Sequence, residues 1–195
     1  SPSRGLGDVY KRQEQIACGI ASATGLPLVI ARPALVYGPG DLHLLGWFRA
    51  IQRGLYRVVG NGQSLLHPIY ISDLIQGLLR CAEAPQAQGR IYHLVGERPL
   101  PIAELAASIA NALGKRLRPG HIPLTLAYLG AYMLENIPGV KPEQLPLSRQ
   151  RITFMTQSRA YCGCRAREEL GFIPYTSLTD GLRATVAWYQ EQHLL

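Results

Sequence analysis

The sequence has no apolar run long enough to span a bilayer and no visible signal-peptide pattern. Its first residues include Arg4, Asp8 and Lys11 where a signal peptide would have an apolar segment. The most apolar stretch covers residues 122–134, whereas a spanning helix needs about 20 residues. We therefore expect a buried or interfacial helix there, and contact of residues 122–137 with a membrane stays an alternative.

Cysteine is scarce, and its spacing excludes two common kinds of site. Cys18 and Cys81 lie in apolar helical patterns and are expected to be small core residues. Cys162 and Cys164 form a C-x-C pair without a second pair at zinc-ligand spacing, so we predict no metal site. No disulfide framework is indicated, which favours a reducing, cytoplasmic location.

Acidic residues are also few: 13 Asp and Glu stand against 20 Lys and Arg, giving a net charge of +7. A basic excess can indicate nucleic acid, an anionic surface or an anionic ligand. The basic residues are spread along the chain without a run of five, and aromatic residues are not interleaved with them. We therefore expect no nucleic-acid binding, but a solvated surface with at most one pocket for an anionic ligand.

The glycine fingerprint of dinucleotide-binding folds is missing. "GNG" at 60–62 has Leu65 where the third glycine of G-x-G-x-x-G should be, and a turn follows it instead of a helix. No P-loop, metal-binding helix or G-x-S-x-G elbow is present either. A nucleotide phosphate loop is therefore not expected within this chain.

Strand and helix patterns nevertheless alternate. Residues 27–31 and 90–95 are short apolar runs typical of buried parallel strands. Residues 32–41 are predicted to be a loop because they hold two prolines and two glycines. Residues 55–71 are predicted to be a hairpin around Asn61-Gly62. The order indicates an α/β fold with parallel strands, and since two strands make a poor sheet, we expect that the first half of the fold lies outside this chain.

Helices are predicted between and after these strands. The helix before 27–31 should end at Gly25, and the helix after the hairpin should be capped by Ser72 or Asp73. Further predicted elements are a helix from Pro101 to before Gly114, a short strand within 116–122, helices at 123–136 and 143–155, and a last helix opened by the Ser177 and Asp180 capping box.

Four motifs, in order, resemble one known family. They are "RPALVYGPGD", "GNGQSLLHPIYISDL", "GRIYHLVGERPLPIAELAASIANALGK" and "AREELGFIPYTSLTDGLRATVAWYQ". Together they are similar to the extended short-chain dehydrogenase/reductases, the NAD(P)-dependent epimerases, dehydratases and reductases, over about residues 14–192. The resemblance implies the C-terminal part of a Rossmann-like, doubly wound parallel sheet, interleaved with a mostly helical substrate-binding lobe over 14–195. It also implies NAD or NADP as cofactor and a small-molecule substrate. Members of the family usually form dimers, and the oligomeric state of the parent protein stays open between a homodimer and other states.

The resemblance also suggests site residues. Pro33 and Ala34 match the family segment that lines the nicotinamide. The alternative is that Pro33, Pro39 and Gly40 only shape a turn. Leu35, with Val36, matches a substrate-contacting segment in which the family often has Asn at the position of Leu35. His67 and Tyr70 are further candidates for substrate contact, while a backbone-bonded structural role for His67 is the alternative.

Two departures in this segment narrow the substrate. Leu35 cannot hydrogen-bond, and Leu66 stands where nucleotide-sugar enzymes of the family tend to carry Arg. Both favour a substrate that is less charged than a nucleotide sugar.

The catalytic pair of the family is absent. Tyr10 and Lys11 are adjacent, about 100° apart on a helix, whereas the chemistry needs Tyr-x-x-x-Lys on one face. Matching Glu14 to the family's acidic residue puts Tyr10 at the lysine position and Leu6 at the tyrosine position. Residues 1–13 resemble a peptide that recurs at the ends of translated metagenomic fragments, so we expect a non-native stretch there, with a natural divergent N-terminus as the alternative.

The sequence therefore predicts part of an NAD(P)-dependent epimerase, dehydratase or reductase acting on a carbinol or carbonyl carbon. We expect this chain to be inactive alone, with no catalytic residue of its own. The alternative is a non-catalytic family member that serves as a binding or assembly subunit.

Overall fold

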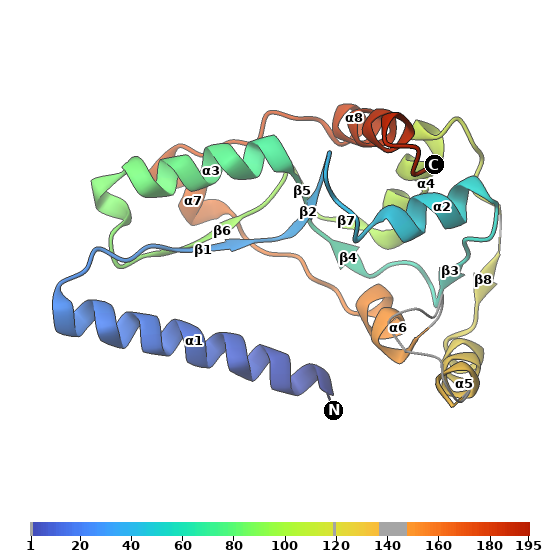
Figure 1. Ribbon diagram of the computed structural model, residues 1–195, viewed down its shortest axis with the longest axis horizontal. Coiled ribbons are helices and arrows are strands. Elements are labelled where there is room, and N and C mark those ends of the chain that lie inside the picture. The colour runs from blue at the N-terminus through green and yellow to red at the C-terminus, as the bar shows by residue number, and fades with distance from the viewer. Residues whose placement is uncertain (1, 119, 137–147) are drawn as a thin grey trace.

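The computed structural model describes residues 2–118, 120–136 and 148–195, with side chains from residue 11 onward. Helices alternate with short strands (Figure 1). The described helices are α1 (Pro2–Thr24), α2 (Leu45–Gln52), α3 (Ile71–Glu83), the 3-10 turn η1 (Pro85–Ala87), α4 (Ile102–Ala112), α5 (Leu124–Glu135), α6 (Arg149–Thr156), α7 (Cys164–Leu170) and α8 (Leu178–Glu191). The described strands are β1 (Ile30–Pro33), β2 (Leu35–Tyr37), β3 (Val58–Val59), β4 (Leu65–Leu66), β5 (Pro68–Tyr70), β6 (Ile91–Leu94), β7 (Leu100–Pro101) and β8 (His121–Ile122). The α/β class is as predicted.

The described strands pair two by two. β1 pairs with β6, β2 with β5 and β3 with β8, all in parallel, whereas β4 and β7 are antiparallel. The β1–β6 pair confirms the parallel strands predicted at 27–31 and 90–95, although the first begins only at Ile30.

The chain changes its pairing partner between β1 and β2. The backbone N–H of Ala34 donates to the Leu94 carbonyl at 3.0 Å, and the next N–H, of Leu35, donates to the His67 carbonyl at 3.2 Å. The β1–β6 and β2–β5 pairs therefore diverge at Ala34. Since open α/β sheets bind ligands at the carboxyl ends of their strands, this divergence defines the place to look for a site.

The predicted loop at 32–41 is wrong in its first half, because β1 and β2 run through it. The N–H groups of Ile30 and Ala34 donate to carbonyl groups on the β6 side. Because neighbouring residues of a strand direct their N–H groups to opposite sides, the nitrogen of Pro33 faces away from β6. Proline therefore costs the β1–β6 pair no hydrogen bond at this position. Proline content alone could not show that its nitrogen faces away from the partner strand.

The predicted hairpin is also wrong. Its two halves, β3 and β4, do not pair with each other but with β8 and β7. The turn itself is present, since Gly60 and Gly62 both have φ of 70°. The Asn-Gly pair predicts the turn only. The strands on either side of the turn pair with strands that are distant in the sequence.

Helix boundaries follow the predictions more closely. Gly25 (φ 71°) ends α1 and Gly114 (φ 64°) follows α4. At the last helix, Ser177 Oγ accepts from the Asp180 N–H at 3.1 Å, as the capping box predicted. α5 confirms the helix at 123–136 and β8 the short strand, whereas residues 143–147 of the next predicted helix lie outside the described residues.

Ser72 and Asp73 do not cap α3, which begins one residue earlier at Ile71 without a side-chain cap. The carboxylate of Asp73 is buried and holds the segment before α8. It accepts from the Tyr175 N–H at 3.3 Å and from the N–H and hydroxyl of Thr176, each at 3.1 Å.

Two main cores lie on either side of the divergence. One packs α3 and α7 onto β1–β6, through residues that include Ile69, Tyr92, Leu94, Leu170 and Phe172. The other joins α2, α4 and α8, through residues that include Phe48, Leu105, Ile109, Leu182 and Tyr189. A sheet-based lobe and a helical lobe therefore meet at Ala34.

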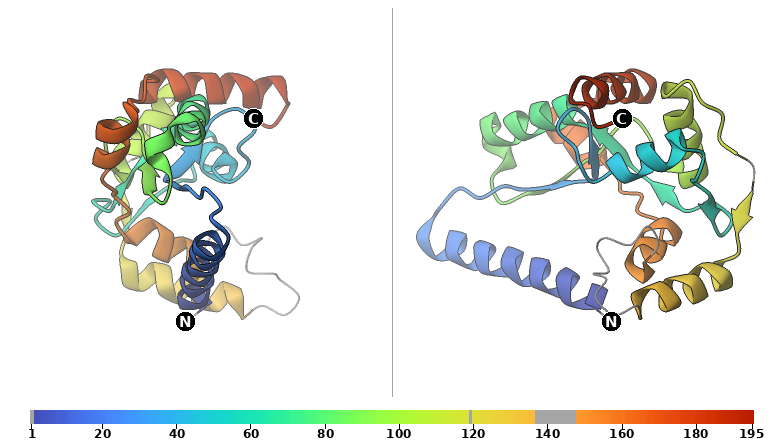
Figure 2. Two further views of the ribbon diagram at one scale, coloured as in Figure 1. Left: turned by 90° about the vertical axis from the view of Figure 1, so that its left-hand side faces the viewer. Right: turned by 45° about the vertical axis from the view of Figure 1, so that its right-hand side comes forward.

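The helix α1 stands apart from both cores (Figures 1 and 2). Ile16 and Ile20 are 55% and 54% exposed. Cys18 is exposed too, so its predicted core role is wrong, whereas Cys81 is buried as predicted. An amphipathic pattern predicts an apolar face, but not whether the chain holds anything to cover it.

Gly96, two residues after β6, lies close to the backbone of β5, and a substitution tests this close approach. A Cβ added at this buried residue would lie 2.0 Å from the Pro68 carbonyl oxygen, and rigid backbone cannot yield as a side chain can. We expect Gly96→Ala to lower the free energy of unfolding by about 3 kcal/mol or more, measured by urea denaturation.

Gly46→Ala in α2 is the matched control, because nothing lies within 4 Å of the added Cβ. It should raise stability by roughly 0.5–1 kcal/mol through helix propensity. Equal stability of the two variants would contradict the close passage of Gly96.

Candidate functional site

Pro33 and Ala34, the predicted cofactor-contacting residues, lie at the carboxyl end of β1. Pro33 is exposed and offers its ring without a backbone donor, while the Ala34 N–H is already engaged with Leu94. An exposed prolyl ring on a backbone fixed by hydrogen bonds can support a flat ligand ring. Contact of Pro33 and Ala34 with a nicotinamide stays a prediction.

The next two predicted residues, Leu35 and Val36, point in opposite directions, as neighbouring strand residues do. Leu35 packs against the core of the helical lobe and Val36 against the core beneath α3 and α7. Both are half-buried. A ligand on one side of β2 can contact one of these side chains, and both assignments stay predictions.

Leu66 is 1% exposed and belongs to the core of the helical lobe. Its strand neighbour across an isolated parallel bridge is Arg159. The Arg159 guanidinium lies 4.7 Å above the Phe154 ring and donates to the Phe154 carbonyl at 3.3 Å. The cationic side chain opposite Leu66 in this bridge is therefore held against an aromatic ring.

An aromatic cluster lies between α2 and α6, and the sequence patterns did not reveal it. Trp47 lies 5.6 Å from Tyr56 and 6.2 Å from Phe154, measured between ring centroids. The hydroxyl of Tyr56 is buried without a hydrogen-bond partner, and burial raises its pKa. These residues are far apart in the sequence, so only the fold brings them together.

His67 is 4% exposed. Its Nε2 lies 3.1 Å from the Gly96 carbonyl, while its Nδ1 makes no hydrogen bond. Burial lowers the His67 pKa, and the backbone carbonyls of Gly96 and Tyr161 oppose that shift.

This imidazole lines a cavity of about 270 Å³, with Cys162, Arg167 and Phe172 among the other lining residues. The structural role predicted as the alternative for His67 applies to its Nε2 atom, which lies within hydrogen-bond distance of a backbone carbonyl. Its Nδ1 atom has no hydrogen-bond partner.

Tyr70 lines a different cavity, of about 340 Å³, together with Asp73, Arg98 and Thr176. Its ring packs edge-on against Tyr37 at 5.6 Å. Burial, followed by Tyr175 and Asp73, raises the pKa of Tyr70. Gly96 and Glu97 line both cavities. The structure thus places His67 and Tyr70 in separate cavities and does not bring them together in one pocket.

A polar cluster joins α1 to the sheet. The Arg32 guanidinium makes two hydrogen bonds to the Glu14 carboxylate, which lowers the pKa of Glu14. His93, opposite Arg32 in the β1–β6 register, stacks on Tyr161 at 5.1 Å. Burial, and then Arg32, lowers the pKa of His93, while Glu14 opposes this shift. Arg32 and Tyr161 are polar contacts near β1 that sequence reasoning missed.

The remaining candidates from the sequence are Tyr10, Lys11 and the C-x-C cysteines. Lys11 is exposed, and the side chain of Tyr10 lies outside the described part. Cys162 and Cys164 are joined as a disulfide, which the sequence did not predict. Among the residues that the structure describes, no His, Cys, Asp or Glu group of three or more is arranged to hold a metal ion.

Comparison with known proteins now identifies the family. Residues 11–94 match the model of the NAD dependent epimerase/dehydratase family. The chain is 29% identical to short-chain dehydrogenase/reductase family 42E member 1 of Bos taurus, over 94% of this chain and 51% of that protein. It is 30% identical to 2-alkyl-3-oxoalkanoate reductase of Stenotrophomonas maltophilia, over 84% of this chain and 52% of that protein. The chain thus spans about half the length of these curated relatives.

The fold agrees with this assignment. The Bordetella bronchiseptica enzyme WbmF, solved with NAD⁺ and UDP, superimposes with a TM-score of 0.66 at 22% identity, over 92% of this chain and 51% of that structure. This likeness confirms the Rossmann-like α/β class, and the family uses NAD(P). The chain belongs to the extended short-chain dehydrogenase/reductase family, among the NAD dependent epimerases and dehydratases.

Proposed function

We propose that this chain supplies part of the active site of a longer NAD(P)-dependent reductase, epimerase or dehydratase. The observation that carries the proposal is the divergence of strands at Ala34, which leaves the Pro33 ring exposed at the carboxyl end of β1. In the proposed enzyme, Pro33 and Ala34 contact the nicotinamide end of the dinucleotide, which supplies the hydride. The target is a carbinol or carbonyl carbon.

The proposed substrate is weakly charged and carries apolar groups. Leu35 offers no hydrogen bond, Leu66 is buried, and Arg159 is held over an aromatic ring. A site that faces a diphosphate needs charge-assisted donors, which these positions lack. The name of one relative, 2-alkyl-3-oxoalkanoate reductase, states an alkyl-bearing oxo acid and supports the same choice.

We propose further that the chain alone does not catalyse the reaction, because its sequence holds neither Tyr-x-x-x-Lys nor the glycine-rich loop. Residues 14–195 would be the native part, and the longer protein would be a cytoplasmic homodimer. The second candidate is a non-catalytic binding or assembly subunit. Absence of the catalytic pair and the basic excess favour it, and the sequence of the source gene upstream of residue 14 discriminates between the two.

The chain alone should bind NADPH weakly, with a dissociation constant above about 1 mM, because most of the affinity for a dinucleotide comes from its pyrophosphate. Isothermal titration of the folded chain, verified by a cooperative urea transition, measures this. Micromolar affinity would show that the chain holds a complete cofactor site and would contradict the proposal.

In the full-length gene product, Leu35→Asn should lower kcat/KM for an alkyl-bearing oxo acid by roughly tenfold or more, because an amide then faces an apolar group without a partner. Steady-state NADPH oxidation measures the change. Leu42→Asn, at a residue 61% exposed before α2, is the control. Wild-type activity of Leu35→Asn toward that substrate would remove Leu35 from the site.

A further inference from the structure

The cavity beside Tyr70 contains polar groups that the rest of the protein leaves without partners. Its volume of about 340 Å³ is at the lower end of the range for small-molecule sites. Tyr37 and Tyr70 line it from the ends of β2 and β5. Residues 176–179, which lead into α8, line it as well, together with Glu104 and Ser108 of α4. Segments that are distant in the sequence therefore meet around one space.

The Tyr37 hydroxyl is the most informative of these groups. Tyr37 is 3% exposed, and its hydroxyl makes no hydrogen bond to any residue that the structure describes. Within the same residues, the enclosed polar side-chain atoms without a partner belong to Tyr56 and His67. The Tyr37 hydroxyl is therefore not enclosed, and the cavity that Tyr37 lines gives a ligand access to it. Because a buried hydroxyl without a partner costs free energy, a ligand that bonds it is favoured.

Other groups of the lining are free in the same way. In the described part of the chain, the hydroxyls of Tyr70, Ser108 and Thr179 make no hydrogen bond. The Glu97 carboxylate has neither a hydrogen bond nor an ion pair there. The Asp73 carboxylate, in contrast, already accepts its hydrogen bonds from the segment before α8. The lining thus offers several hydroxyls and one carboxylate to a ligand.

The charge of the lining is negative. Its acids are Asp73, Glu97 and Glu104. Its one cation is Arg98, which is paired with Glu104. Burial raises the pKa of Tyr37, and the Asp73 charge is the next cause of this shift. A negative field that opposes ionisation of a phenol attracts a cation to the same place.

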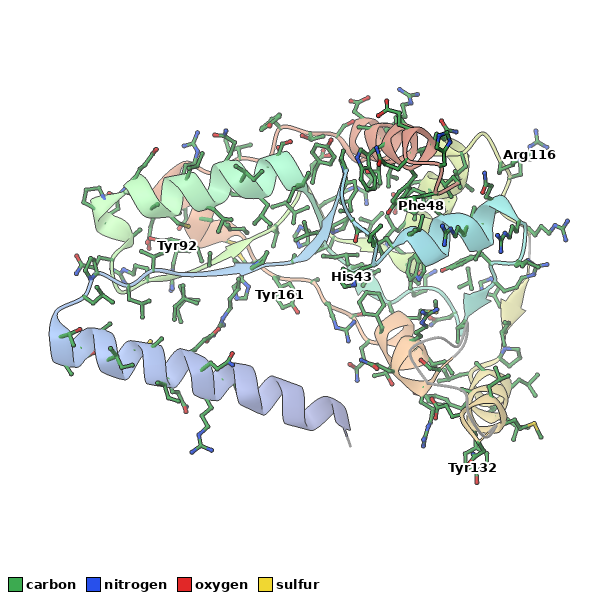
Figure 3. The ribbon with its side chains drawn as sticks, viewed as in Figure 1. His43, Phe48, Tyr92, Arg116, Tyr132 and Tyr161 are labelled. Carbon is green, nitrogen blue, oxygen red and sulfur yellow. A yellow bond between two sulfur atoms is a disulfide. The ribbon has the colours of Figure 1, made fainter. Side chains whose placement is uncertain are left out.

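This lining disfavours anionic and apolar ligands. Lys115 and Arg116 follow α4 but do not line the cavity, and Figure 3 shows Arg116 at the edge of the molecule. An anion would therefore lie beside carboxylates without a free cation to bond it. An apolar ligand, such as a lipid chain, would leave the free hydroxyls without partners. The described residues include no helix that is long and apolar enough to cross a bilayer.

We propose that this cavity binds a small protonated amine that also carries hydroxyl groups. Its ammonium group donates to the Glu97 carboxylate, and its hydroxyl groups bond the hydroxyls of Tyr37 and Ser108. Hydroxyl groups suit these partners because they both donate and accept, and a hydrogen bond to an ionised group is the stronger kind. This ligand differs from the weakly charged substrate proposed above, because the surroundings of Leu35 are apolar.

Two probes that differ in one group test the proposal. Serinol carries an ammonium group where glycerol carries its central hydroxyl. An NMR titration of the whole chain near neutral pH measures both dissociation constants. Serinol should bind at least about tenfold more tightly, since a charge-assisted hydrogen bond exceeds a neutral one by roughly that factor. Absence of serinol binding, or glycerol binding as tightly as serinol, would overturn the proposal.

Two substitutions locate the site. Tyr37→Phe should weaken the binding of both probes by about threefold or more. It should not lower stability, because the hydroxyl that it removes bonds no described residue. Glu97→Gln keeps the size of the side chain and should abolish the preference for serinol. Wild-type binding by Tyr37→Phe, or the full preference in Glu97→Gln, would contradict the assignment.

Glu168→Gln is the matched control, because Glu168 lines the cavity beside His67 whereas Glu97 lines both cavities. It should bind serinol as wild type does. A urea transition verifies that each variant is folded, and Ser108→Ala replaces Tyr37→Phe if that variant is unstable. Loss of the serinol preference in Glu168→Gln would place the ligand beside His67 and overturn the proposal.

Discussion

Two adjacent backbone N–H groups determine how the rest of this structure is arranged. The Ala34 N–H completes the pairing of β1 with β6, and the Leu35 N–H begins the pairing of β2 with β5. A strand that continued along one partner would keep Pro33 inside a regular sheet. Because the partner changes, the sheet-based lobe and the helical lobe separate at this point, and the prolyl ring stands at the exposed end of β1.

The polar groups near the divergence are already held by other parts of the molecule. Asp73 binds the segment before α8, Arg32 binds Glu14, and Arg159 lies over Phe154. These side chains hold helices and loops in place and do not lie beside Leu35. The side of β2 that carries Leu35 is therefore largely apolar. His67 is the exception, because its buried Nδ1 has no hydrogen-bond partner. This distribution is the physical basis for expecting a weakly charged substrate.

Local signals in the sequence predicted local structure well. The capping box at Ser177, the glycine ends of α1 and α4 and the parallel apolar strands are present, and the family motifs led to the correct fold. Predictions that needed distant partners failed. The two halves of the expected hairpin pair elsewhere, Asp73 bonds residues about a hundred positions away, and Cys18 lies on a helix with little to pack against. The separate cavities of His67 and Tyr70 also follow from tertiary packing, which no spacing along the chain encodes.

The central claim is that the divergence at Ala34 forms one wall of a cofactor and substrate site. A crystal structure of the full-length gene product with NADPH and an alkyl-bearing oxo acid tests it most directly. If the divergence forms this wall, the nicotinamide ring will lie in van der Waals contact with Pro33 and the alkyl group will lie against Leu35. A nicotinamide ring bound in the cavity beside His67, away from Pro33, would contradict the account.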